Sequence, residues 1–249
     1  MSKMKDDTMK KVLLAGVAVL GLSFGAMAAD NYASIDQAGT SNYNYQSQTG
    51  NQGRFEATQS GTGNSNTQYQ TGNNNRGRVE QNGTSNYAYQ SQSGSNNNGN
   101  GTGLNWGAFV KQTGTGNSSS QTQSGNANQA RGYQDGTRQS LTQVQTGNEN
   151  NALSEQYSST GSSVTQYQYG TASRAIAYQG YATNSSITQT QNYGTGNYAF
   201  SEQRNGNNMS ASITQSGDRN TAYTDQRGNN LTAIATQSGT SNYSYQYQR

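Results

Sequence analysis

The 249-residue chain contains no proline, cysteine or histidine, and only 28% of its residues are hydrophobic. Without cysteine and histidine it has no disulfides, no thiolate or imidazole metal ligands, and neither of these residues for nucleophilic catalysis. Proline cannot donate to a β-ladder, so its absence suits a backbone that is paired on both sides throughout. Globular domains carry nearly half apolar residues, so a conventional apolar core is excluded.

Charge is also scarce in this sequence. Of its 15 basic and 12 acidic residues, four lysines and two aspartates precede residue 12, which leaves 11 basic and 10 acidic residues. These charges are scattered singly and form no basic stripe, so nucleic-acid binding is not indicated. A near-neutral surface instead permits self-association. The composition alone is typical of a disordered, Gln/Asn-rich chain, but the order of the residues argues otherwise.

The first 28 residues have the pattern of a secretory signal peptide. Two lysines precede an apolar run from Val12 to Phe24, and Ala26-Met27-Ala28 follows as a cleavage signal. An apolar run of this length cannot span the roughly 30 Å of a bilayer core. We therefore predict that residues 1–28 are removed, and that residues 29–249 are exported without stable membrane insertion.

An eleven-residue repeat begins at Gln37. With Gln at position 0, glycine falls at +2, asparagine often at +5 and a small residue often at +7, as in Gln81-Gly83-Asn86-Ala88. A fixed period of this kind indicates a stacked architecture. The predicted ladder glutamines are Gln37, Gln48, Gln59, Gln70, Gln81, Gln92, Gln112, Gln123, Gln134, Gln145, Gln168, Gln179, Gln203, Gln215, Gln226, Gln237 and Gln248. The predicted ladder asparagines are Asn42, Asn64, Asn86, Asn117, Asn128, Asn150, Asn197, Asn220 and Asn242, and the predicted turn glycines are Gly39, Gly61, Gly83, Gly114, Gly125, Gly147, Gly217 and Gly239.

The repeat positions predict one strand and one turn per unit. Glycine and asparagine tolerate positive φ, so +2 to +5 is expected to form a turn. The next six residues are expected to alternate in a strand, with +5, +7, +9 and +11 inside and the tyrosines at +6 and +8 outside. Two units then make a coil of about 22 residues, in which buried amides hydrogen-bond to their copies one layer away. The fold expected is an all-β solenoid.

The period departs from eleven at a few places. The exceptional intervals run over nine residues from Gln92 to Gly101, 12 from Gln156 to Gln168, 13 from Gln179 to Asn192 and 12 from Gln203 to Gln215. Counted this way, Gln37 to Gln248 holds 19 units, and the total is about ten coils. Trp106, the only tryptophan, stands beside the short unit and is expected to fill a bulge.

The pattern Gln-x-Gly-x-x-Asn-x-Ala-x-x-x-Gln resembles the curlin repeat of bacterial curli fimbrial subunits, over essentially the whole exported chain. The resemblance implies a solenoid that polymerises outside the cell into cross-β amyloid fibres of the biofilm matrix, which mediate adhesion. It also implies partners: other copies of the chain, a nucleator subunit and the curli secretion machinery. About ten coils, where familiar subunits have about five, indicate an expanded, major-subunit-like relative. The N-terminal segment that the family uses for its secretion channel is not evident here, which leaves the export route open.

The sequence leaves three alternative functions. The chain could be the minor, nucleating subunit of the same fibre. It could be a monomeric solenoid that binds ice or glycans on a flat face, although the recurring Thr40, Thr62, Thr84, Thr115 and Thr240 fall at a turn position. An enzyme is the weakest alternative, because the acids are dispersed and an across-coil pair such as Glu56 and Glu80 is expected only to be solvated. No cofactor, metal or catalytic residue is predicted.

Overall fold

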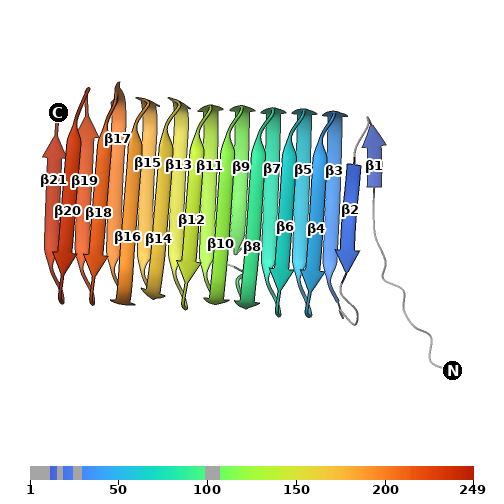
Figure 1. Cartoon of the computed structure of the whole chain (residues 1–249), viewed down its shortest axis with the longest axis horizontal. Helices are drawn as coiled ribbons and strands as arrows, with labels where there is room; N and C mark the ends of the chain where they lie inside the picture. Colours follow the sequence, from blue (N-terminus) through green and yellow to red (C-terminus); the bar gives the residue numbers. More distant parts are fainter. Residues whose placement is uncertain (1–11, 16–18, 25–29, 99–106) are drawn as a thin grey trace.

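The structure is a single stack of β-strands (Figure 1). It is a computed structural model that describes residues 12–15, 19–24, 30–98 and 107–249. Within these ranges the regular elements are all strands, and no helix there is long and apolar enough to cross a membrane. The predicted all-β class is confirmed.

Odd- and even-numbered strands form separate sheets, called here the odd sheet and the even sheet. The odd sheet contains β1 (Val12–Ala15), β3 (Tyr32–Thr40), β5 (Arg54–Thr62), β7 (Arg76–Thr84), β9 (Ala108–Thr115), β11 (Gln129–Thr137), β13 (Asn151–Thr160), β15 (Arg174–Thr183), β17 (Tyr198–Asn207), β19 (Thr221–Arg227) and β21 (Tyr243–Gln248). The even sheet contains β2 (Val19–Phe24), β4 (Tyr43–Thr49), β6 (Ser65–Thr71), β8 (Tyr87–Ser95), β10 (Ser118–Asn126), β12 (Ser140–Thr146), β14 (Ser163–Thr171), β16 (Ser186–Thr195), β18 (Ser210–Ser216) and β20 (Thr232–Ser238).

Each strand except the first and last of its sheet pairs in parallel with the strands two before and two after it, so the described chain winds as a solenoid. Glutamine stands beside glutamine in every layer from β3 onward, as in Gln59 beside Gln81 and Gln70 beside Gln92. One turn of the solenoid therefore takes two repeats. The predicted coil of about 22 residues, and a stack of about ten turns, are confirmed.

Two sequence assignments were wrong. Gly101 is not a rung, because β7 pairs directly with β9 and places Gln81 beside Gln112. The interval from Gln92 to Gln112 thus holds one repeat plus nine extra residues in the connection between β8 and β9, where 99–106, including Trp106, lie outside the described residues. Asn192 is not a rung either, because Gln191 pairs with Gln168 and Gln215. An insertion changes the spacing of the sequence while the register of the strands is kept.

The turn is shorter than predicted, because strands of the odd sheet continue through the glycine at +2 to a threonine at +3. Positive φ occurs at this glycine and again at +4, as in Gly39 (φ 107°) and Ser41 (φ 56°). Position +4 also accepts Arg138 and Glu149 in the left-handed region. These residues disfavour that conformation by about 1–2 kcal/mol, so the stacked neighbours must impose it.

The interior follows the predicted alternation but contains apolar columns that were not predicted. Positions +5, +7, +9 and +11 are buried along the strands, while the tyrosines at +6 and +8 face outward, as in Tyr43 and Tyr45. Val79 and Val110 stack with Ala88 in one apolar cluster, and Leu141, Val164 and Ile187 belong to another. The core is thus a sandwich of amide rows and aliphatic rows rather than amides alone.

The predicted signal peptide is only partly described. β1 pairs with β3 and β2 pairs with β4, so both strands extend the stack beyond β3 and β4. The predicted cleavage signal at 26–28 lies outside the described residues. Removal of residues 1–28 remains a prediction.

Candidate functional site

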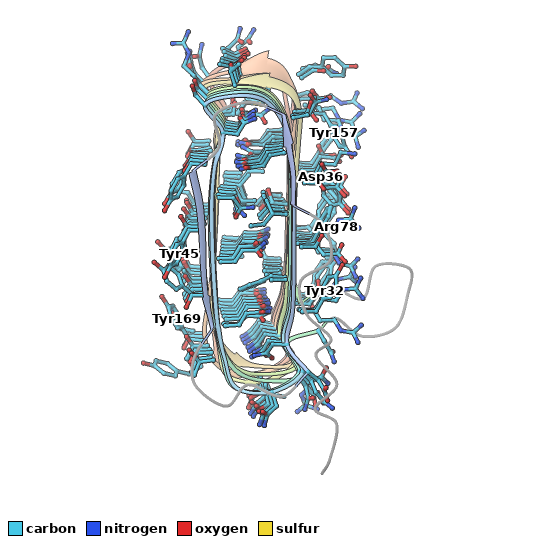
Figure 2. All side chains as sticks on the ribbon, turned by 90° about the vertical axis from the view of Figure 1, so that its right-hand side faces the viewer. Tyr32, Asp36, Tyr45, Arg78, Tyr157 and Tyr169 are labelled. Atoms are coloured by element: carbon cyan, nitrogen blue, oxygen red, sulfur yellow. The ribbon has the colours of Figure 1, made fainter. Side chains whose placement is uncertain are left out.

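The interior carries three continuous glutamine ladders. Figure 2 shows the rows of stacked side chains between the two sheets. The odd ladder contains Gln37, Gln59, Gln81, Gln112, Gln134, Gln156, Gln179, Gln203, Gln226 and Gln248. The even ladder contains Gln48, Gln70, Gln92, Gln123, Gln145, Gln168, Gln191, Gln215 and Gln237. The inner ladder, two residues earlier on the even strands, contains Gln46, Gln68, Gln90, Gln121, Gln143, Gln166 and Gln189.

Gln145 shows the geometry that most rungs in the middle of a ladder share. Gln145 accepts a hydrogen bond from Gln123 (2.9 Å), donates to Gln168 (2.8 Å) and donates its second N–H to the carbonyl of Gln129 (2.9 Å). In all three ladders Nε2 of the earlier rung donates to Oε1 of the later one. A buried amide in mid-ladder is therefore satisfied by its neighbours above and below, which removes the usual cost of burying it.

Sequence reasoning placed the odd and even ladders in one series. It treated Gln156 as a repeat position without including it in the predicted ladder, and it missed Gln191 and the whole inner ladder. The signal for the inner ladder was present as Gln-x-Gln, which recurs on alternate repeats, as in Gln121-Thr122-Gln123 and Gln143-Val144-Gln145. A 22-residue search finds this pattern, whereas an 11-residue search averages the two sheets and hides it.

The asparagines at +5 form two columns, one in each set of turns, and hydrogen-bond each turn to those of neighbouring layers. Asn64 receives the backbone N–H of Asn86 on Oδ1 (3.0 Å), and its Nδ2 donates to the carbonyls of Ser60 (3.1 Å) and Gly83 (3.0 Å). Asn42, Asn64, Asn86 and Asn117 form the column between odd and even strands. Asn128, Asn150, Asn197, Asn220 and Asn242 belong to the opposite column, which also contains Asn75 and Asn97, two residues absent from our predicted set.

The turn glycines stack directly on one another. A Cβ added to Gly61 would lie 2.1 Å from the carbonyl oxygen of Gly83, and one added to Gly83 would lie 2.0 Å from that of Gly114. Gly39, Gly114, Gly125, Gly147 and Gly217 have the same close approach, whereas a Cβ added to Gly239 in the last turn would meet only the side-chain Nδ2 of Asn242, at 3.5 Å. We predicted glycine here for its positive φ, but the closer constraint is the backbone of the next layer.

The two ends of the ladders differ. We call β3 and β4 the leading edge, which β1 and β2 cover in this structure. There the buried Oε1 atoms of Gln37, Gln46 and Gln48 accept no hydrogen bond from the described residues. β20 and β21 form the trailing edge, and they are the last strands of their sheets. There Nε2 of Gln248 donates to the Thr232 carbonyl (2.8 Å), with no further rung beyond it in the described chain. The leading edge therefore has side-chain amide acceptors without donors, whereas the trailing edge has side-chain amide donors.

The outer faces of the two sheets differ in charge. Strands β4 to β20 of the even sheet contain no charged residue and present serine, threonine and tyrosine. On the odd sheet Glu56 and Glu80 lie in a row of ion pairs through Arg78, rather than forming a carboxylate pair. In Figure 2, Tyr32, Asp36, Arg78 and Tyr157 project from the odd sheet, and Tyr45 and Tyr169 from the even sheet.

The outer tyrosines of the odd sheet predict alkaline sensitivity. Burial raises the pKa of Tyr133, and Glu155 raises it further, against the opposing effect of Arg131. A raised folded-state pKa favours the neutral phenol, so its contribution to stability is present below about pH 10 and is lost as pH rises through the raised value. We expect the urea midpoint to fall above about pH 10, and to fall less in Tyr133→Phe. An equal fall in both chains would contradict this assignment.

The described residues include no group of three or more His, Cys, Asp or Glu that could hold a metal ion. The interior instead provides hydrogen bonding along the stack, which any further layer of the same sequence can extend.

A family model for the curlin associated repeat matches residues 72–98, which include β7 and β8, and residues 210–239, which include β18 to β20. No curated protein matches the chain. The repeat chemistry, the stacked fold and these two matches agree, and the chain contains curlin associated repeats.

Proposed function

We propose that this chain is a secreted structural subunit of a curli-type amyloid fibre, and that copies join end to end through their leading and trailing edges. The observation that supports this most is the difference between the two edges: the Oε1 acceptors without a donor at the leading edge, which removal of residues 1–28 would uncover, match the amide donors at the trailing edge. An open parallel edge is also a template for pairing with another chain. Such a fibre would contribute to the biofilm matrix and to adhesion, and the chain would have no enzymatic role.

The predicted signal peptide supports export to the cell surface. The major subunit is favoured over the minor nucleator, because the repeat nearest the trailing edge keeps the consensus from Gln237 to Gln248. A nucleator subunit and the curli secretion machinery are the partners this role would need. The outer tyrosines form rows, as in Tyr45 and Tyr69, whose ring centroids are 5.5 Å apart. These rows offer an aromatic surface for lateral contact between fibres.

The test is fibre diffraction on two forms of the protein, the full chain and the chain starting at Ala29. The shorter form should give oriented fibres with a meridional reflection near 4.7–4.8 Å, the spacing of paired strands. The full chain should assemble more slowly, because β1 and β2 occupy the leading edge. A β-rich shorter form that stays monomeric would refute the fibre role.

A second candidate function is the monomeric binding module, for which the even sheet provides a specific observation. Its central strands repeat Ser118, Ser140, Ser163, Ser186 and Ser210 in one outer row. A flat, uncharged hydroxyl array of this kind suits ice or a glycan. The monomeric outcome of the diffraction test would favour this function, and glycan-array or ice-shaping assays would then separate the two ligands.

A further inference from the structure

If the leader is removed, the remaining stack begins and ends on the same sheet, because β3 and β21 both belong to the odd sheet. Suppose the next copy is translated along the stack without rotation. Its β3 then pairs with β21, and no strand is left to pair with β20. A buried strand edge with unpaired N–H and C=O groups is strongly disfavoured.

We propose that successive copies are related by a half turn about the long axis, so that β3 of the next copy pairs with β20 and β4 pairs with β21. This inference rests on the proposed function, which it deepens by specifying the interface. The winding of the chain is then continuous, since β3 takes the place that one more repeat after β21 would occupy. Both trailing strands obtain a full partner.

The glutamine ladders fit this arrangement. β21 carries Gln246 and Gln248 as a Gln-x-Gln pair, although other odd strands have apolar or small residues two positions before the ladder glutamine, such as Ala57 and Val79. The pair matches Gln46 and Gln48 of β4 in register, and Gln237 matches Gln37 of the next copy. All three unpartnered Oε1 atoms of the leading edge then face an Nε2 atom of the trailing edge.

The other interior columns fit as well. At the inner-ladder position the even sheet changes from glutamine to Ile213 and Ala235 in its last two strands, which suits Ile35 of the next copy's β3. Asn242 would receive Asn42 of the next copy and extend an asparagine column. Without rotation Asn42 would instead follow Leu231, the last residue of a column in which asparagine has already been lost. The trailing edge thus presents the residue types of the leading edge with the two sheets exchanged.

Engineered cysteines distinguish the two arrangements, because the chain has no native cysteine. Asp36 on β3, Thr236 on β20 and Tyr247 on β21 are exposed on the outer faces. A half turn places Asp36 of one copy beside Thr236 of its neighbour, at the strand spacing of about 4.8 Å, which lies within the Cα range of a disulfide. Direct translation instead places Asp36 beside Tyr247.

We expect Asp36→Cys/Thr236→Cys to form covalent multimers on oxidation, seen on a non-reducing denaturing gel, and Asp36→Cys/Tyr247→Cys to stay largely uncross-linked. The reverse result, or fibres in which neither pair cross-links, would overturn the half turn while leaving the fibre role intact. Absence of fibres from the unmodified chain would instead refute the proposed function. The pairs Ser34→Cys/Ile234→Cys and Ser34→Cys/Tyr245→Cys repeat the comparison if one of the first variants does not fold.

Discussion

Replacing Gly61 with alanine should destabilise the solenoid by about 3 kcal/mol or more. The left-handed φ of 108° costs a non-glycine residue about 1–2 kcal/mol. The added Cβ would in addition lie 2.1 Å from the carbonyl oxygen of Gly83, a backbone atom that can move only if the two layers separate. Overpacking of this kind typically costs a further 1–3 kcal/mol or so. Urea unfolding of the dilute chain measures the loss.

The matched control lies two residues away in the same turn. Gly63 also has positive φ (66°), but the nearest atom to its added Cβ is Oγ of Ser85 at 3.6 Å. Other turns place Asn74 or Ala127 at this position. Gly63→Asn should therefore cost less than about 1 kcal/mol, since asparagine tolerates this conformation. Equal losses for the two variants would show that φ alone, and not the stacked backbone, makes glycine necessary.

Replacing Gln143 with leucine, which has a similar volume, should cost about 2–4 kcal/mol. The change leaves one N–H of Gln121 and the Oε1 of Gln166 without their partner, and the Arg131 carbonyl loses a donor. Each buried polar group left unsatisfied costs about 1–3 kcal/mol, which the apolar gain of leucine offsets only in part. Hydrogen exchange should show the largest loss of protection in β10, β12 and β14.

Thr142→Val is the control for this prediction, because Thr142 faces outward beside Gln143 and valine keeps β-branching. Its effect should stay within about 0.5 kcal/mol. A Gln143→Leu chain as stable as the control would mean that the inner ladder fills space without contributing hydrogen-bond energy.

The period, the facing of each position and the stacked fold could be predicted from the sequence, because Gln, Gly and Asn recur at spacings that only a layered chain explains. The insertion after β8 was misassigned because Gly101 happens to stand near a repeat position. Residues such as Arg138 and Glu149 could not be predicted in the left-handed region, because their conformation is imposed by neighbouring layers rather than by local preference. The three ladders were not separated because an 11-residue period merges alternate repeats, which the strand pairing assigns to different sheets.

The amides of the three glutamine ladders all point the same way along the stack, each Nε2 toward the next Oε1. Their dipoles therefore add, as peptide dipoles do along a helix, and hydrogen bonds in such chains polarise one another. A layer in the middle of a long stack is then held more strongly than the same layer in a short one. The free energy of unfolding should increase with the number of layers faster than in simple proportion. A stack of about ten turns obtains that gain within one chain.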